Sequence, residues 1–343
     1  MFVGGRLVPR AYPRPANSHL LRNEGVQNGV PVFSDVSEEL APVLKELGMV
    51  TDAAWLDFDQ DGLQDLVVVG EWMPITFLKN RNGIFEDNTE AYGLEKTTGW
   101  WYSIAADDFD QDGDMDLVAG NLGLNYKYQA STDESFDVYA NDYDKNGKMD
   151  IVLGYYYDGV QYPLRGRQCS SEQIPAIKLK FEDYNSFAQA TLEEVYSEGD
   201  LESSLHYQAY TFASSYVENL GDGKLSIQQL PNEVQISSIN GIVTNDFNGD
   251  GNIDLMVAGN LYNAEVETTR NDAGYGNVLL GDGTGNFSPL SYAESGIYIP
   301  HDTKDLKLLK GKKGLFIVAA NNNEALKIFQ LTAGTSGEIL AQK

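Results

Sequence analysis

Short apolar runs alternate with polar turns along the whole chain, and four of these runs directly follow a cluster of acidic residues. The first such run covers residues 66–69, is rich in valine, and follows the acidic segment 57–65. Apolar runs of this length between turn residues are typical of buried strands. The pattern predicts an all-β fold in which each acidic segment is a tight loop that joins two strands.

The acidic segment 57–65 has the ligand spacing of a calcium loop. Carboxylates stand at positions 1, 3, 5 and 9, and Gly62 stands at position 6, where the chain must turn sharply. Hard oxygen ligands at this spacing suit Ca²⁺. An EF-hand would need a bidentate Glu at position 12 and a helix on each side. Position 12 is Val68, inside the apolar run, so the loop is expected to join strands.

The same loop recurs at 108–116, 142–150 and 246–254, each time before an apolar run. With the main-chain carbonyl of position 7 included, the predicted ligands of up to four calcium ions are Asp57, Asp59, Asp61, Leu63, Asp65, Asp108, Asp110, Asp112, Asp114, Asp116, Asp142, Asp144, Asn146, Lys148, Asp150, Asp246, Asn248, Asp250, Asn252 and Asp254. The alternative is a set of ion-free turns, because Asp, Asn and Gly are ordinary turn residues. Asn146 and Asn248 lower the charge of the last two loops.

This repeat resembles the FG-GAP or VCBS repeat of β-propellers such as the integrin α-subunit head. Segments 2–6, 163–169 and 265–273 also resemble the C-terminal part of bacterial VCBS-repeat proteins that carry ASPIC and UnbV domains. The resemblance implies a β-propeller of about five to seven four-stranded blades. It also implies a protein that accompanies glycan-uptake or adhesion systems.

The repeat spacing leaves the third loop ambiguous. Asp57 and Asp108 are 51 residues apart, whereas Asp142 follows Asp108 after only 34. We favour a third loop at the outer hairpin of the second blade, and the alternative is a blade reduced to two strands. In the segment 305–331, lysines replace the aspartates of the repeat, so this degenerate unit should bind no calcium.

The domain prediction is one propeller over residues 1–331, followed by a C-terminal tail at 332–343. Residues 158–204 interrupt the repeat as an insertion that is helical near 176–198, with one helix from Ser186 to Ser197 that begins at a capping box. Residues 2–5 match the strand that should follow an acidic loop. We therefore expect a fragment of a longer exported protein that starts in mid-blade, with Met1 an internal or cloned start and further domains elsewhere in the parent chain.

Composition narrows the classes of partner. The formal charge is −27, which argues against nucleic acid and anionic membrane surfaces. No apolar run is long enough to span a membrane, and no signal-peptide pattern is visible. Calcium loops of this kind are most useful where calcium is millimolar, so the prediction is an extracytoplasmic protein, at the cell surface, in the outer membrane or secreted.

Successive strands of a blade are antiparallel, so ligands are expected on the face opposite the calcium loops. The candidate ligand-binding residues there are Trp72, Trp100, Trp101, Asn121, Tyr126, Tyr156, Asn260, Tyr262, Arg270 and Asp272. Exposed aromatic and polar side chains suit a glycan or a protein ligand, and packing between blades is the alternative for the aromatic ones. Arg165 and Arg167 are expected to pair with acidic neighbours.

The sequence therefore predicts a non-enzymatic calcium-binding recognition or scaffolding module with an adhesion-like role. The alternative is a calcium-dependent polysaccharide lyase or hydrolase. The three histidines, His19, His206 and His301, lie in no nucleophile or metal motif, and Cys169 is expected to be a buried structural residue.

Overall fold

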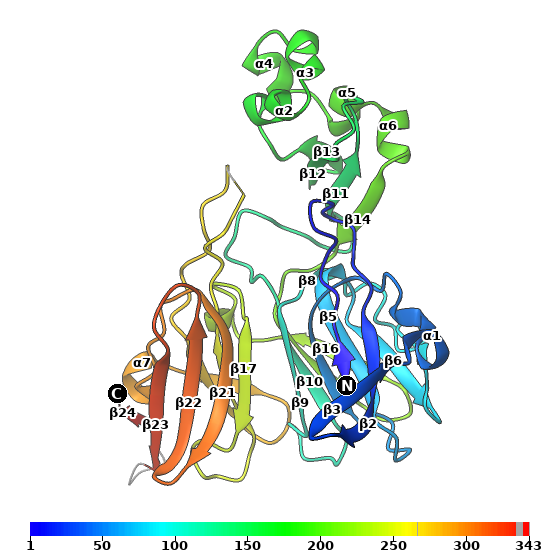
Figure 1. The fold of residues 1–343 in the computed structure, drawn as a ribbon. Helices are drawn as coiled ribbons and strands as arrows, with labels where there is room; N and C mark the ends of the chain where they lie inside the picture. The colour runs from blue at the N-terminus through cyan, green and yellow to red at the C-terminus, as the bar shows by residue number, and fades with distance from the viewer. Residues whose placement is uncertain (266, 334–338, 343) are drawn as a thin grey trace.

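The chain folds into small antiparallel sheets that stand side by side (Figure 1). The structure is a computed structural model, and it describes residues 1–265, 267–333 and 339–342. The first sheet contains β1 (Phe2–Val3), β2 (His19–Gln27) and β3 (Val30–Asp35). The short helices α1 (Ser37–Leu40) and η1 (Pro42–Leu44) follow it. The chain is mostly β, and this part of the fold prediction is confirmed.

Four more sheets continue the array. The second has the order β4 (Met49–Leu56), β5 (Asp65–Met73), β6 (Thr76–Arg81), β7 (Ile84–Asp87), and β8 (Gly99–Trp100) also pairs with β5. The third has the order β9 (Ser103–Asp107), β10 (Asp116–Gly120), β15 (Ser215–Asn219), β16 (Leu225–Gln229). The fourth has the order β17 (Gly241–Asn245), β18 (Asp254–Ala258), β19 (Asn277–Gly281), β20 (Phe287–Leu290), with η2 (Asn232–Val234) before it and α7 (Tyr292–Ser295) after it.

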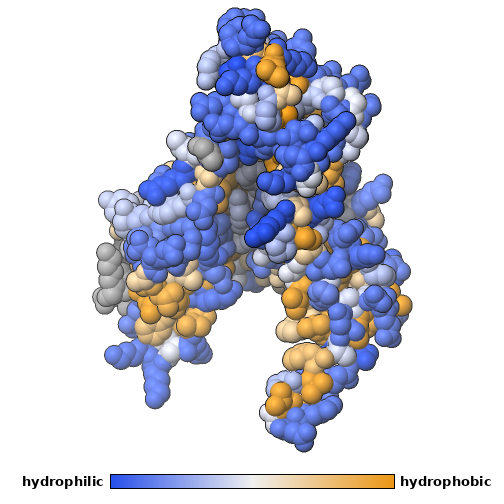
Figure 2. All heavy atoms as spheres, turned by 45° about the horizontal axis from the view of Figure 1, so that its top comes forward, coloured by the Kyte–Doolittle hydropathy of each residue, from blue (hydrophilic) through white to orange (hydrophobic). Residues whose placement is uncertain are grey.

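The fifth sheet has the order β21 (Thr303–Gly311), β22 (Gly314–Asn321), β23 (Lys327–Ala333), β24 (Ile339–Gln342). β24 lies within the segment 332–343 that the sequence predicts as a tail, and it pairs with β23. The first strands of the sheets lie next to one another, with β9 between β4 and β17, and β17 beside β21. The first and last sheets end the array on opposite sides (Figure 1), and an open gap separates the two sides in Figure 2. The described residues form no closed ring.

The cores lie between neighbouring sheets. On β5, Val67 and Val69 pack with Leu117 of the third sheet. Leu66 and Val68 point the other way and pack with Leu20 of the first sheet. Both faces of β5 are therefore buried, and this explains why its sequence is continuously apolar rather than alternating.

The third acidic loop lies in an insertion between β10 and β15, which corrects the sequence prediction. It joins β11 (Phe136–Asn141) to β12 (Asp150–Tyr157) in a separate sheet, which has the order β13 (Val160–Pro163), β12, β11, β14 (Leu205–Ala209). Neither an outer hairpin nor a two-stranded blade is therefore right. The outer strands of the third sheet come from beyond residue 214. Such pairing across a long insertion is possible because additional loop length costs little entropy. The interruption spans 121–214, more than the predicted 158–204.

The predicted helix from Ser186 to Ser197 is wrong as a single element. The insertion holds five short helices: α2 (Arg167–Gln173), α3 (Ala176–Lys180), α4 (Tyr184–Ala188), α5 (Leu192–Tyr196) and α6 (Glu198–Glu202). Asp183, rather than Ser186, caps α4, and Thr191 with Glu194 forms the capping box of α5. A new capping box at Thr191 starts a second helix where the apolar period alone predicts a continuation. None of the described helices is long and apolar enough to cross a membrane.

Candidate metal centres and a candidate ligand pocket

The four acidic loops share one backbone conformation. The position-6 glycines have left-handed φ angles: 84° at Gly62, 97° at Gly113, 84° at Gly147 and 94° at Gly251. Position 4 is left-handed as well, with φ of 57° at Gln60 and 64° at Gln111. The glycine requirement inferred from the sequence is therefore confirmed, and a second special position adjoins it.

Three loops bring three carboxylates together. In each triad, one oxygen per residue lies within 4.8 Å of the others, and the triads are Asp57, Asp59 and Asp61; Asp108, Asp110 and Asp112; Asp142, Asp144 and Asp150. In the fourth loop the position-3 residue is Asn248, whose amide donates to Asp250 at 2.9 Å. This loop forms no such triad among the described residues.

Two carboxylate oxygens fit a cation best. Oδ1 of Asp57 and Oδ1 of Asp108 are buried, and neither has a hydrogen-bond partner among the described residues. The other oxygen of Asp57 accepts from the Gly62 N–H at 2.9 Å. A buried carboxylate oxygen without a donor is costly. A divalent cation would satisfy this oxygen, so the donor sets of the first two loops fit calcium.

The position-9 aspartates hold the sheets together. Asp65, Asp116 and Asp254 are fully buried, and each accepts one N–H from position 2 of its own loop and another from the third strand of its sheet. The third-strand donors are Asn80 at 2.7 Å, Asn219 at 2.8 Å and Gly281 at 3.0 Å. These carboxylates therefore join the loop to a strand far along the chain, in addition to any contact with an ion.

Burial raises the pKa values of these aspartates. Desolvation raises the pKa of Asp116 to about 6, although hydrogen bonds from Asn219 and Tyr216 oppose the shift. Desolvation likewise raises the pKa of Asp65, Asp150 and Asp254. A nearby cation would favour the ionised forms and lower these pKa values.

The first two loops differ in a neighbouring charge. Lys79 of β6 forms an ion pair with Asp59 and lies 3.7 Å from Asp61. Lys79 directly precedes Asn80, and Glu218 directly precedes Asn219 at the corresponding point of the third sheet. Burial raises the pKa of Asp110, and the negative charge of Glu218 adds to this shift. The second loop is therefore more negative than the first.

Glutamines at position 4 link the loops of adjacent sheets. Gln60 donates to the Gly113 carbonyl at 3.1 Å and to Asp114 at 2.5 Å. Gln111 donates in the same way to the Gly251 carbonyl at 3.0 Å and to Asn252 at 2.8 Å. The first, second and fourth loops therefore form one continuous acidic face, while the third lies apart in the insertion.

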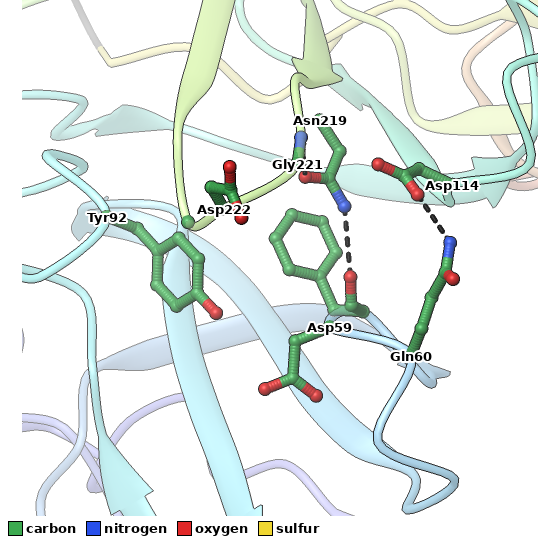
Figure 3. Close-up of a pocket in the computed structure, with 9 residues that line it drawn as sticks. Asp59, Gln60, Tyr92, Asp114, Asn219, Gly221 and Asp222 are labelled. Atoms are coloured by element: carbon green, nitrogen blue, oxygen red, sulfur yellow. Dashed lines mark hydrogen bonds between the residues drawn. The ribbon is translucent and has the colours of Figure 1, made fainter.

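A cavity of about 420 Å³ opens between the first two loops (Figure 3). Carboxylates of Asp59, Asp114 and Asp222 and the ring of Tyr92 line it. Figure 3 shows the bond from Gln60 to Asp114 and the bond from Asn219 to the Phe58 carbonyl, which is 2.9 Å long. The cavity extends the acidic face.

The opposite face exposes fewer of the candidate ligand-binding residues than the sequence predicts. Trp72, Trp101, Asn121 and Asn260 are buried. The Asn260 side chain holds its loop through Gly274 and the His301 carbonyl. These four residues support the fold, and ligand contact is not available to them. The packing alternative is the correct one for the two tryptophans.

The remaining candidates fall into separate places. Trp100 and Tyr126 line a pocket of about 280 Å³. Tyr126, Arg270 and Asp272 line a second pocket of about 330 Å³. Arg270 lies over the ring of Tyr262, 4.4 Å from its centroid, and Tyr156 lies on β12 in the insertion.

The 280 Å³ pocket, which we call the aromatic pocket, lies where the insertion meets the sheets. Its lining comes from seven segments and includes Arg6, Tyr12, Glu71, Trp100, Tyr102, Tyr126, Tyr128, Ile151, Leu153, Arg165, Leu261, Asn263, Ala264 and Glu265. Glu71 is near the end of β5, whereas the acidic loop precedes β5. The pocket therefore lies on the face opposite the acidic loops of the sheet array, as the alternation of strands predicts.

Two arginine–glutamate pairs lie in this pocket. Arg6 contacts Glu71 at 2.5 Å, and Arg165 contacts Glu265 at 3.4 Å. The predicted acidic pairing of Arg165 is confirmed. Arg167 differs, because its guanidinium donates to the main-chain carbonyls of Phe181, Lys178 and Glu182. Cys169 is half-buried rather than buried, which corrects the prediction, and a hydrogen bond to Glu267 raises its pKa, so the thiol form is favoured.

Sequence reasoning missed Arg6 and Tyr12 as members of the pocket. Both lie between β1 and β2: Tyr12 is in the proline-rich stretch predicted as a loop, and Arg6 is at the end of the segment predicted as the first strand. The guanidinium of Arg6 and the ring of Tyr12 were the only local features of the sequence that could have indicated a role in ligand binding. Their partner Glu71 is 65 residues from Arg6 along the chain, so no local pattern reveals the pair.

Comparison with known proteins supports the FG-GAP resemblance for part of the chain. A family model described as FG-GAP-like repeat matches residues 57–119, which include the first two acidic loops. A search of curated proteins found no match. Among solved structures, the crystal structure of the V. cholerae biofilm matrix protein Bap1 matches over 95% of this chain and 70% of that chain. The identity is 10% and the TM-score is 0.29, which is too low to carry an argument.

Proposed function

We propose that the chain is a calcium-stabilised recognition or scaffolding module that works outside the cytoplasm. The observation that carries this proposal is the pair of buried, unpartnered Oδ1 atoms at Asp57 and Asp108. Each lies in a triad of carboxylates that repel one another without a cation. Calcium would convert this repulsion into a link between the first and second strands of each sheet.

The side-by-side sheets support the finer proposal that they are blades of a β-propeller. Each acidic loop of the array joins the first two strands of a sheet, as in the FG-GAP and VCBS repeats that the chain resembles. The five sheets fall within the proposed range of five to seven blades. Relationship to VCBS-repeat proteins with ASPIC and UnbV domains remains part of this proposal.

An extracytoplasmic location follows from the proposed ion. Surface loops of this kind suit calcium at millimolar concentration, which is found outside the cytoplasm. The formal charge of −27 would also be reduced by each ion that binds. A protein or glycan ligand is proposed for the face opposite the acidic loops.

Recognition is favoured over the alternative of a polysaccharide lyase or hydrolase. A lyase acting on uronates needs an arginine or a metal ion that is free to bind the substrate carboxylate, and the acidic loops of the sheet array that could hold an ion lie on the opposite face from the aromatic pocket. Both arginines of the aromatic pocket are already paired with glutamates. The described lining of the pocket therefore has no free arginine to neutralise the carboxylate of an acidic sugar, and its arrangement favours binding without catalysis.

Thermal unfolding with and without calcium tests the proposal. An ion at 100 times its dissociation constant stabilises the folded chain by about 2.7 kcal/mol per site. We expect the melting temperature to rise when calcium is added to chelator-treated protein, and to rise less in the double variant Asp57→Asn/Asp108→Asn. Equal melting temperatures in calcium and in chelator would refute calcium stabilisation. Magnesium serves as the control ion because it prefers a smaller, octahedral site.

A further inference from the structure

The aromatic pocket has the shape and lining of a small-molecule site. The loop between β1 and β2 and the loop between β18 and β19 both rise to the base of the insertion (Figure 1), and both contribute lining residues. Trp100 packs edge-on against Trp72 at 5.2 Å and Tyr128 at 5.4 Å, so its ring is fixed in place. A wall residue that is already fixed reduces the entropy lost when a ligand binds.

Several polar groups in the pocket lack partners. Among the described residues, Nε1 of Trp100 is buried and makes no hydrogen bond, and Nε of Arg165 has only its ion-pair contact with Glu265 at 3.4 Å. The hydroxyls of Tyr102 and Tyr126 likewise have no hydrogen-bond partner in the described part of the chain. A buried donor without an acceptor is costly, so the Trp100 N–H in particular is a group that a polar ligand would satisfy.

The charge of the pocket is balanced. Arg6 is paired with Glu71, and Glu71 also accepts from the Tyr12 hydroxyl at 2.7 Å. Arg165 is paired with Glu265. An anionic ligand would meet two carboxylates, and a cationic ligand would meet two guanidinium groups. The electrostatics therefore favour a neutral ligand.

We infer that the aromatic pocket binds one neutral sugar residue of a glycan. This inference rests on the proposed recognition function and names its ligand class. Sugar hydroxyls both donate and accept, so they match glutamate acceptors beside arginine, tryptophan and tyrosine donors. The C–H face of a sugar ring packs on an aromatic ring such as Trp100 or Tyr126. The volume of about 280 Å³ suits a single ring rather than a peptide segment.

Glycan-array binding followed by calorimetric titration tests the inference. The array carries neutral oligosaccharides, uronate-containing oligosaccharides and peptides, and it is probed with the whole chain in calcium. We expect binding to neutral glycans. The best neutral oligosaccharide is then titrated into the wild type and into Trp100→Phe, which keeps an aromatic ring but removes the Nε1 donor. Loss of one hydrogen bond from a buried donor should weaken binding about tenfold.

A matched control and a second variant keep the test decisive. Trp55→Phe makes the same change at an exposed tryptophan of β4 outside the pocket, and it should bind as the wild type does. Glu265→Gln keeps the shape of the side chain but removes the carboxylate that pairs with Arg165 and that would accept from sugar hydroxyls. This variant should also weaken binding of the neutral glycan. Absence of neutral-glycan binding, preference for uronates or peptides, or unchanged binding by Trp100→Phe would overturn the inference. Melting curves of the same samples with and without calcium test the proposed calcium stabilisation separately.

Discussion

Replacement of Asp116 by asparagine tests whether the position-9 carboxylates hold the sheets together. Asp116 is fully buried. Its Oδ1 accepts from the Asn219 N–H at 2.8 Å, and its Oδ2 accepts from the Phe109 N–H at 3.3 Å and the Tyr216 hydroxyl at 2.7 Å. An asparagine has one oxygen for these donors, so one of the two backbone N–H groups must lose its acceptor in either orientation of the amide.

The magnitude follows from the number of lost bonds. A hydrogen bond to a charged group contributes about 1.5–3 kcal/mol, so the loss of at least one predicts destabilisation by about 2 kcal/mol. The asparagine is neutral, so the variant does not bury a charge. This gain offsets part of the loss, and the expected destabilisation therefore lies in the lower part of the range. The loss should appear in chelator as well as in calcium, because these bonds do not depend on an ion.

Chemical unfolding in chelator is the assay, and Asp112→Asn is the matched control. Asp112 is exposed at position 5, and its Oδ1 accepts one backbone N–H that the amide oxygen can keep. The control should therefore stay within about 0.5 kcal/mol of the wild type in chelator. If Asp116→Asn and Asp112→Asn unfold alike in chelator, the role assigned to position 9 is wrong.

Three further predictions follow from the same loops. The difference in stability between the wild type and Asp116→Asn, measured in chelator, should grow as pH falls from 7 to 5. Burial raises the folded-state pKa of Asp116 to about 6, so protonation of Asp116 favours the folded state. This stabilisation is fully present below the unfolded-state pKa and is lost as pH rises through about 6. A flat difference over this range would contradict the shift. Gly113→Ala should destabilise the chain by about 1–2 kcal/mol in thermal unfolding because its φ is 97°, whereas Gly199→Ala, in helix α6 with open space around it, should not destabilise it; equal losses would remove the strain argument. Gln111→Ala removes the bonds to Gly251 and Asn252 and should speed amide exchange in the fourth loop, and unchanged exchange there would mean that the loops are not coupled.

Local features of the fold could be predicted from the sequence because short-range chemistry determines them. The glycine at position 6 needs a left-handed φ, and all four loops have it. The hairpin at Asn82 and Gly83 joins β6 to β7, as an Asn-Gly pair predicts. The buried run of β5 was recognisable because both of its faces are covered.

Long-range features could not be predicted because one sequence does not show which strands pair. β15 pairs with β10 across the whole insertion, and the acidic loop at 142–150 looks the same in sequence whichever sheet contains it. The links from Gln60 and Gln111 to the next loops depend on how neighbouring sheets are placed. The aromatic pocket joins seven separate segments, so its composition emerges only when the chain is folded.

Calorimetric titration of calcium into chelator-treated protein tests the central claim most directly. The structure predicts saturable binding of at least two ions, with the second loop binding more tightly than the first because Glu218 stands where Lys79 pairs with Asp59. Asp108→Asn should then remove the tighter site and Asp57→Asn the weaker one. Saturable binding that each variant reduces in this order would support the account, and absence of saturable heat in the wild type would contradict it.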